Sequence, residues 1–291
     1  MGTVTMRTAN TVLLTTVAMV AFAANSILCR LALGRGLIDA ASFTTVRVIS
    51  GAIILAVIIF GRRTQRSAKA NWGSVAALFI YMAFFSFAYL SLGAATGALV
   101  LFGAVQLTMF VVALQQGEHF SVPSWFGLAL AAAGLVYLVS PGVTAPDPLA
   151  AVLMTIAGIA WGIYSLIGRS TLDPITATAY NFILSVPLVV GTSLLFVADL
   201  AISPAGILLA AASGAIASGI GYVIWYAALR GLNATSAATV QLSVPVIAAI
   251  GGVILLAEDL TPRLVIASAA TLGGVAIVLL QRTRPAGRQH A

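Results

Sequence analysis

The stretch from residue 70 to residue 117, ANWGSVAALFIYMAFFSFAYLSLGAATGALVLFGAVQLTMFVVALQQG, contains no charged side chain. A helix needs roughly 20 apolar residues to cross about 30 Å of hydrocarbon, so this stretch predicts two membrane-spanning helices. Similar charge-free intervals separate Asp173, Asp199, Arg230 and Glu258, and each is long enough for one further span. The chain is also 61% hydrophobic, whereas globular domains are about 45–50% apolar. These observations predict an all-α polytopic membrane protein.

Ten transmembrane helices are expected along the chain, and glycine or proline residues fall between most of them. The first seven residues and the apolar run after them resemble a secretory signal peptide. That run continues as far as Cys29, so we expect a retained first helix and a buried cysteine without a disulfide. The predicted spans are residues 11–33, 43–60, 73–92, 96–115, 123–140, 149–168, 175–198, 204–229, 234–257 and 262–281.

The basic residues of the short loops predict the orientation, because loops rich in Lys and Arg stay in the cytoplasm. With the N-terminus inside, ten of the 14 basic residues fall on the cytoplasmic side. We therefore expect a multi-pass protein of the bacterial inner membrane with both termini in the cytoplasm. The net charge of +7 follows from this topology, and no nucleic acid partner is expected. The ten residues are Arg7, Arg62, Arg63, Arg66, Lys69, Arg169, Arg230, Arg282, Arg284 and Arg288.

The two halves of the chain resemble each other. The segment 22–30, FAANSILCR, aligns with the segment 161–169, WGIYSLIGR. Each begins with an aromatic residue, contains a serine at the same place and ends with an arginine. A glutamate then stands between the fourth and fifth spans of each half, at Glu118 and Glu258. The pattern indicates an internal repeat of five spans.

An odd number of spans between matched positions inverts the second copy in the membrane. Inverted repeats are typical of secondary transporters, whose substrate site lies between the repeats. Plain duplication of a helical bundle is the alternative, but it gives no reason for the inversion. We expect residues 1–145 and 146–291 to form two inverted five-helix repeats around a central cavity, the second with a short basic cytoplasmic tail. Pro187 and Pro245 interrupt the seventh and ninth spans and are predicted hinges of an alternating-access movement.

Two short motifs and a proline carry a family resemblance. Residues 118–123 read EHFSVP, residues 257–262 read AEDLTP, and Pro245 lies in the ninth span. In this order and spacing they resemble the drug/metabolite transporter (DMT) superfamily, EamA family. The aromatic-rich third, sixth and eighth spans resemble the YddG-type aromatic amino acid exporters of that family most. The first repeat departs from the second, because Gln106 stands near the place that Pro245 occupies.

The resemblance implies a basket of helices around a cavity that opens alternately to each side. Spans 1, 3, 4, 6, 8 and 9 would line the cavity, and spans 5 and 10 would support it from outside. The implied protein is a monomeric secondary transporter in the lipid bilayer, without cofactor, that exports aromatic or hydrophobic amino acids. The alternative is a carrier that imports or exchanges another metabolite or drug. No catalytic or metal-binding residue is predicted, because the spans hold no nucleophile with a base and no metal-ligand cluster.

Polar side chains within the spans are candidates to contact a substrate. They are costly in hydrocarbon and tend to face the interior of a bundle. Hydrogen bonds between helices are the alternative, and the better one for single Ser and Thr residues. Asn25 and Tyr164 occupy matched positions in the two repeats. The predicted polar contacts are Asn25, Gln106, Asn181 and Gln241.

Aromatic residues gather in the third, sixth and eighth spans. A deep hydroxyl or indole N–H needs a hydrogen-bond partner, which a cavity supplies. The alternative is a position at the membrane interface, which suits Tyr89, Trp225 and Tyr226 near span ends. The predicted aromatic contacts are Tyr81, Phe84, Phe85, Trp161, Tyr164 and Tyr222.

None of the seven acidic residues lies at the centre of a predicted span. A carrier of cations usually needs a buried carboxylate, so the predicted substrate is neutral, zwitterionic or apolar. Arg30 and Arg47 are the deepest basic residues. Arg47 is a candidate partner for a substrate carboxylate. A salt bridge with Asp39, or extension of the side chain to the headgroups, is the alternative.

Overall fold

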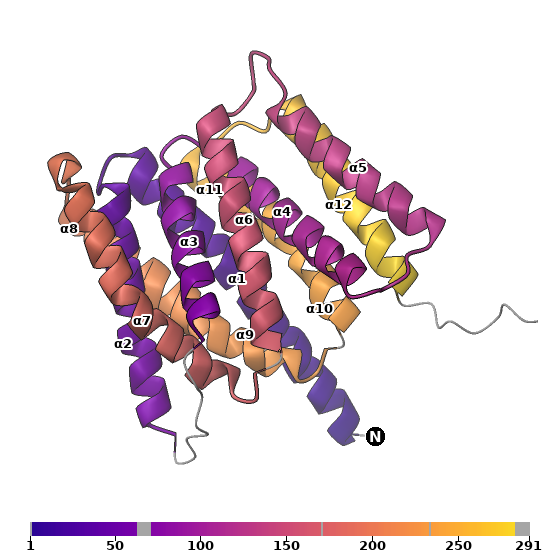
Figure 1. Cartoon of the computed structure of the whole chain (residues 1–291), viewed down its shortest axis with the longest axis horizontal. Helices are drawn as coiled ribbons and strands as arrows, with labels where there is room; N and C mark the ends of the chain where they lie inside the picture. The colour runs from indigo at the N-terminus through magenta and orange to yellow at the C-terminus, as the bar shows by residue number, and fades with distance from the viewer. Residues whose placement is uncertain (1, 63–70, 170, 233, 283–291) are drawn as a thin grey trace, which may run out of the picture.

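The chain forms a bundle of helices in a computed structural model, which describes residues 2–62, 71–169, 171–232 and 234–282. Figure 1 shows the bundle with its helices side by side. Its elements are α1 (Gly2–Gly34), α2 (Ala40–Phe60), α3 (Trp72–Ala88), α4 (Ala94–Gln115), α5 (Val122–Val139), α6 (Pro148–Arg169), α7 (Pro174–Leu195), η1 (Val197–Asp199), α8 (Pro204–Ala211), η2 (Ala212–Ile220), α9 (Gly221–Leu229), α10 (Ala234–Gln241), α11 (Ser243–Leu256) and α12 (Pro262–Arg282).

Nine of the helical stretches in the described ranges are long and apolar enough to cross a membrane, and α3 is a shorter apolar helix. Two spans combine several elements: α8, η2 and α9 form one, and α10 with α11 forms another. The all-helical fold with ten apolar segments is therefore confirmed. One boundary differs, because α3 ends at Ala88 and a turn leads into α4 at Ala94.

The outer surface of the bundle is apolar. Large hydrophobic side chains on several helices are more than half exposed, among them Val57, Leu208 and Ile254. In water an apolar surface of this extent would drive association. Around a bundle of this length it is the surface that lipid covers.

Two ends of the bundle differ in how they are closed. The end of the bundle at which α2, α4, α6 and α9 finish, toward the bottom of Figure 1, is called the mouth end. We call the sealed end the opposite one, at which α1, α3, α5, α7 and α11 finish. At the sealed end the loop after α1 meets the loop before α8, and the Ser203 hydroxyl donates to the Leu37 carbonyl oxygen over 2.7 Å. Asp39 and Ala201 bond there as well, through the Asp39 backbone N–H and its carboxylate.

Helices α5 and α12 lie together at one side of the bundle (Figure 1). Small residues bring their backbones into contact: a Cβ on Gly274 would meet the backbone of Gly127 and Ala131, and a Cβ on Gly134 would meet Thr271. Close approach of this kind is how membrane helices associate without a hydrophobic driving force. The expected placing of the fifth and tenth spans outside the basket agrees with this arrangement. The division at residues 145 and 146, and the inversion of the halves, stay predictions.

The ninth span is broken between α10 and α11, at Leu242. Pro245 explains the position of the break, because proline has no N–H to donate to the carbonyl of Gln241 one turn earlier. Pro187, by contrast, lies inside α7, which continues from Pro174 to Leu195. Broken helices are common next to the binding sites of transporters. The hinge role of both prolines stays a prediction.

Candidate functional site

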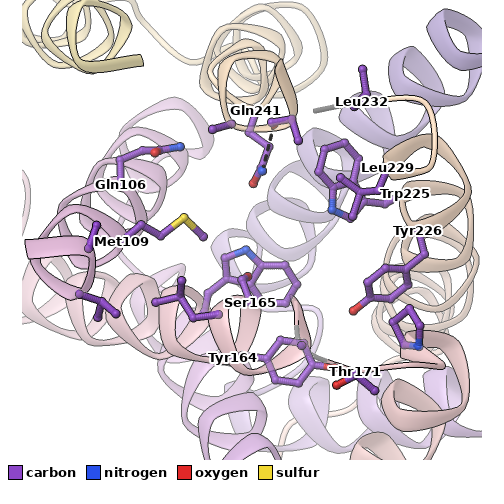
Figure 2. Close-up of a pocket in the computed structure, with 18 of the residues that line it drawn as sticks. Gln106, Met109, Tyr164, Ser165, Thr171, Trp225, Tyr226, Leu229, Leu232 and Gln241 are labelled. Atoms are coloured by element: carbon purple, nitrogen blue, oxygen red, sulfur yellow. Dashed lines mark hydrogen bonds between the residues drawn. The ribbon is translucent and has the colours of Figure 1, made fainter. Parts of the chain in front are cut away.

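A cavity of about 1070 Å³ enters the bundle from the mouth end. Figure 2 shows its walls, which α4, α6, α9 and α10 provide, with Gln106, Tyr164, Tyr226 and Gln241 around the open space. The lining residues belong to loops at the mouth end or to the half of their membrane span nearer that end, with Ala131 at the middle of α5. The cavity is thus a vestibule that reaches mid-depth. This volume suits a small metabolite.

Aromatic rings form the inner wall of the cavity. Trp161 stacks on Tyr164 with ring centroids 5.4 Å apart and lies 5.2 Å from the ring of Tyr222. Phe22 of α1 packs edge-on against Trp161 and Tyr222 from behind. Trp225 completes the wall beside Phe22, 5.9 Å away. Such a wall offers flat apolar faces for stacking and, through their negative π clouds, a favourable place for an ammonium group.

Five of the ten predicted contact residues line the cavity. Trp161, Tyr164 and Tyr222 are in the inner wall, and Gln106 and Gln241 face each other across the space in Figure 2. The Gln241 side chain donates to the Ala237 carbonyl oxygen over 3.2 Å. Gln106 is buried, and its Nε2 has no hydrogen-bond partner in the described part of the chain. An amide with a free donor at a cavity wall is available to a substrate or to water.

The other five predicted residues do not line the cavity. Asn181 donates to the Tyr164 hydroxyl over 3.5 Å, and Asn25 donates to the Tyr81 hydroxyl over 3.4 Å. Tyr81 in turn packs its ring 4.8 Å from that of Trp161. Phe84 is half-buried, and Phe85 is fully buried. The cavity of this conformation does not reach these five residues, and their contact with substrate stays a prediction.

A fully buried arginine, Arg47, lies next to Tyr81 behind the inner wall. Arg47 of α2 is 0% exposed, and its guanidinium donates from Nη2 to the Tyr81 hydroxyl over 3.1 Å. Nε and Nη2 also donate to the Ser218 hydroxyl of η2, over 3.4 Å and 3.3 Å. Asn25 donates to the same Tyr81 hydroxyl, and its side-chain oxygen accepts from the Ser213 hydroxyl over 2.6 Å. We call Arg47, Tyr81, Ser218, Asn25 and Ser213 the Arg47 network.

Neither sequence-based alternative for Arg47 fits the structure. The Asp39 carboxylate accepts from the backbone N–H groups of Ser42 and Ala201. It forms no salt bridge with Arg47, and the described residues contain only the ion pairs of Arg30 and Arg62. A side chain with no exposed surface does not extend to the headgroups. A charge buried in a span without a counter-ion costs about 3 kcal/mol or more, which indicates a functional reason for it.

The eighth span widens where it meets Arg47. The segment η2 has π-helical turns, which are rare and recur at functional sites. Gly214 in this segment contacts the backbone of Arg47 so closely that no side chain would fit. The wide turns also present Ser213 and Ser218 to the Arg47 network. The small residues of this segment gave no sequence signal for these turns, because composition does not reveal a change of helical pitch.

Three aromatic residues near span ends lie inside the bundle. The alternative of a position at the membrane interface, which suited Tyr89, Trp225 and Tyr226, does not fit their surroundings in the structure. Tyr89 is fully buried, with its ring against Gly97 of α4. Trp225 and Tyr226 line the cavity, and the Tyr226 hydroxyl lies 3.3 Å from the Thr178 hydroxyl. The vestibule brings water-accessible volume deep along α9, so a place near a span end does not imply contact with headgroups.

Asp173 and Arg62 form an ion pair at the mouth of the cavity, with Nη1 and Oδ1 3.1 Å apart. The Asp173 carboxylate also accepts from the hydroxyl and the backbone N–H of Thr176, so it caps the first turn of α7. Burial alone would raise the pKa of Asp173, but the hydrogen bonds from Thr176 and Arg62 outweigh it and hold the pKa below its ordinary value. Asp173 is therefore ionised at neutral pH and ties α2 to α7.

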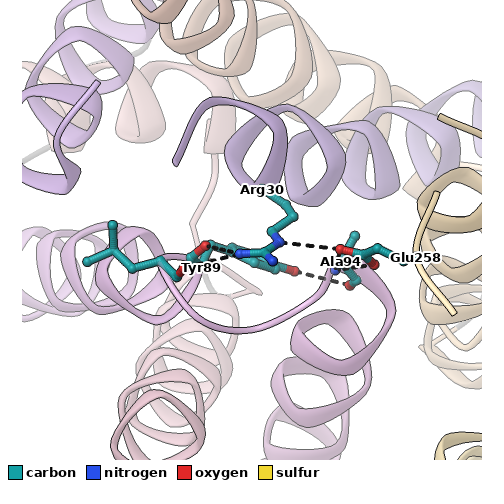
Figure 3. A network of polar contacts seen from close by, with 5 residues as sticks. Arg30, Tyr89, Ala94 and Glu258 are labelled. Atoms are coloured by element: carbon teal, nitrogen blue, oxygen red, sulfur yellow. Dashed lines mark hydrogen bonds and ion pairs between the residues drawn. The ribbon is translucent and has the colours of Figure 1, made fainter. Parts of the chain in front are cut away.

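The sealed end is closed by a second ion pair, shown in Figure 3. Arg30 Nε lies 3.3 Å from Glu258 Oε1, and Arg30 Nη1 donates to the carbonyl oxygens of Tyr89 and Leu90 over 3.3 Å and 3.1 Å. Both Glu258 carboxylate oxygens accept from the Ala94 backbone N–H, over 3.0 Å and 2.8 Å. A carboxylate at this position stabilises the positive N-terminus of α4. The contacts join α1, α3, α4 and the loop before α12.

Residues 148–280, which contain most of the second half of the bundle, match the EamA-like transporter family. An uncharacterized protein of Pseudomonas aeruginosa, PA1977, is 48% identical over 282 residues, which cover 97% of this chain and 98% of that protein. The chain thus contains an EamA-like transporter domain over residues 148–280. The family match agrees with a vestibule that ends at mid-depth between apolar helices. This EamA protein is thus a multi-pass membrane transporter.

More distant relatives of this EamA protein point the same way. An uncharacterized transporter of Archaeoglobus fulgidus is 27% identical over 250 residues, covering 80% of this chain and 86% of the relative. A second uncharacterized transporter of that organism is 26% identical over 216 residues. A crystal structure of a protein with 18% identity superimposes with a TM-score of 0.64 over 94% of this chain and 99% of the other. At that identity the likeness concerns the fold.

Proposed function

We propose that this EamA protein exports amino acids with aromatic or hydrophobic side chains across the bacterial inner membrane. The observation that supports this most is the inner wall of Trp161, Tyr164, Tyr222 and Trp225. Its faces suit an aromatic side chain and an ammonium group alike. Gln106 and Gln241 add neutral hydrogen-bonding groups, and the deep part of the cavity has no carboxylate among its lining residues.

In this proposal the direction of transport is export. The mouth end carries the basic loops, so it faces the cytoplasm, as do both termini. The vestibule is then open to the cytoplasm, and the Arg30–Glu258 pair closes the periplasmic side. This is the conformation in which an exporter takes up its cargo. The protein acts as a monomer that alternates between this state and one open to the periplasm.

A carrier for another metabolite or drug is the second candidate. The composition of the vestibule wall favours this candidate, because the lining also includes non-aromatic apolar residues such as Met109, Leu229 and Leu232 (Figure 2). A wall of this kind accepts many apolar compounds. Import or exchange by the same alternating movement belongs to this candidate.

Counterflow in proteoliposomes distinguishes the two candidates. Vesicles are loaded with one unlabelled amino acid, and uptake of labelled phenylalanine, leucine, serine and lysine is followed against protein-free vesicles. We expect rapid exchange of phenylalanine and leucine, with little exchange of lysine. Folded protein that exchanges none of the four would disprove amino acid transport and leave the carrier of another metabolite.

A further inference from the structure

We propose that Arg47 is the anion-binding residue of this carrier and binds the carboxylate of the substrate. The inference rests on the proposed function, since an amino acid brings a carboxylate into the bundle, and it extends that function to a residue outside the present cavity. It assigns to Arg47 a ligand of a definite class, an organic monocarboxylate.

The first argument is the unused hydrogen-bonding capacity of the guanidinium. Nη1 of Arg47 is buried and has no hydrogen-bond partner in the described ranges. Nε and Nη2 donate only to the neutral hydroxyls of Ser218 and Tyr81. A guanidinium has five N–H donors in a planar fork that matches the two oxygens of a carboxylate. The fork of Arg47 is thus formed, held in place and lacking the anion that it fits.

The second argument is the way in which the side chain is held. The Arg47 guanidinium carbon lies 4.9 Å from the centroid of the Phe85 ring and 5.3 Å from that of Tyr81. The two rings stabilise a cation without neutralising it. An arginine that served only to join helices would be expected to pair with a carboxylate, as Arg30 and Arg62 do, or with carbonyl oxygens, as Arg263 does. The surroundings of Arg47 keep its charge available.

The third argument is the short distance from the cavity, because only the rings of Trp161 and Tyr81 lie between the cavity and Arg47. Tyr81 contacts Arg47 through its hydroxyl and Trp161 through its ring, and Trp161 lines the cavity. A substrate stacked against the inner wall therefore needs a displacement of the Trp161 and Tyr81 rings to bring its carboxylate to Arg47. The carboxylate would replace the Tyr81 hydroxyl at Nη2 and occupy Nη1. Its ammonium group would remain at the faces of the inner wall.

The test uses three ligands that share a phenyl ring. Phenylalanine has both charges, 3-phenylpropionate has only the carboxylate, and phenethylamine has only the ammonium. Binding to purified full-length protein in detergent is followed as an increase in the unfolding temperature. Wild type is compared with Arg47→Met, Arg47→Lys and the control Arg263→Met. Arg263 bonds the carbonyl oxygens of Ser140 and Pro141 at the sealed end.

We expect 3-phenylpropionate to bind Arg47→Met about 10- to 100-fold more weakly than wild type, because a hydrogen-bonded charge pair is lost. Arg47→Lys keeps the charge without the fork and should bind with intermediate affinity. Phenethylamine should bind all four proteins alike, and Arg263→Met should match wild type. Arg47→Met should fold, since it replaces a buried unpaired charge with an apolar side chain. If it does not fold, the comparison of wild type with Arg47→Lys decides.

Unchanged binding of 3-phenylpropionate in Arg47→Met, or in Arg47→Lys where only that variant folds, would overturn the assignment. Equal stabilisation of wild type by sodium chloride would also overturn it, because the site would then take an inorganic anion. Failure of the proposed function looks different: no amino acid exchanges in counterflow, yet 3-phenylpropionate binds in an Arg47-dependent way. Normal exchange of phenylalanine by Arg47→Met with an unchanged KM would instead leave the proposed function intact and remove this inference.

Discussion

Arg30 Nε and Glu258 Oε1 lie 3.3 Å apart and join the first helix to the loop before the last one. The pair stands at the sealed end, on the far side of the bundle from the mouth of the vestibule. The Glu258 carboxylate also accepts from the Ala94 backbone N–H at the start of α4. The Arg30 guanidinium donates to the Leu90 carbonyl oxygen just after α3. A movement that opens this end must therefore separate these two side chains, and the pair favours the conformation described.

Arg30→Gln should open the sealed end more often than wild type. Cys29, the only cysteine of the chain, adjoins Arg30 and is fully buried. We expect a membrane-impermeant maleimide, added from the side of the sealed end, to label Cys29 about tenfold faster in the variant, because charged hydrogen bonds worth about 1.5–3 kcal/mol are lost.

Arg263→Gln is the matched control for this labelling. It removes an arginine from the same end that bonds only carbonyl oxygens and a tyrosine ring in the described structure. Labelling of Cys29 in this control should be as slow as in wild type. Equally slow labelling in Arg30→Gln would show that the ion pair does not control access.

Gly274→Ala should destabilise the contact between α5 and α12. The added Cβ would meet the carbonyl oxygen of Gly127 and the backbone of Ala131, which cannot move aside without shifting the helix. Overpacking of this kind costs about 1–3 kcal/mol. The next residue gives the control, since a Cβ on Gly273 meets nothing within 4 Å. Thermal unfolding in detergent should rank Gly274→Ala below wild type and Gly273→Ala at or above it, and the reverse order would contradict the packing.

Asp173→Asn should lower the free energy of unfolding by up to about 1 kcal/mol at neutral pH, because asparagine still caps α7 but loses the ion pair with Arg62. The pKa of Asp173 is lowered in the folded protein, so its contribution is present above the unfolded pKa, about 3.9. It is lost as the pH falls through the lower folded pKa. The difference between wild type and variant should thus be constant from pH 7 to pH 5 and shrink below about pH 4.

The exposed Asp199 provides the comparison for this pH series. Asp199→Asn should leave the unfolding curve unchanged throughout. A difference between wild type and Asp173→Asn that grows as the pH falls would have the opposite sign to that expected for a lowered pKa.

The sequence predicted the spans well because the hydrocarbon thickness limits them and charges mark their ends. It missed the break at Leu242 by three residues, because Pro245 acts on the carbonyl one turn earlier. The π-helical turns of η2 left no signal in the composition. They depend on how Gly214 meets the backbone of Arg47, a contact between spans 2 and 8.

The candidate site was predicted in part. Trp161, Tyr222 and Gln106 are at the cavity, because large or polar side chains in mid-span usually face the interior. Trp225 and Tyr226 were missed because depth in the membrane was judged from position along the chain. The vestibule brings solvent-accessible space into the bundle, so a residue near a span end can line a cavity and not face the membrane interface. The role of Glu258 as a cap on α4 depends on a contact across the bundle that local sequence does not contain.

The central claim is that substrate binds at the inner wall of the vestibule, and Trp161→Ala tests it most directly. Trp72→Ala is the matched control, because Trp72 begins α3 and is 67% exposed. Phenylalanine counterflow by purified protein in proteoliposomes is measured for both variants and for wild type. We expect Trp161→Ala to lose about 60–90% of the initial exchange rate, since stacking on an aromatic ring is worth about 0.5–1.5 kcal/mol, while Trp72→Ala exchanges like wild type. Equal exchange by Trp161→Ala and Trp72→Ala, from protein that is folded and inserted, would contradict the claim.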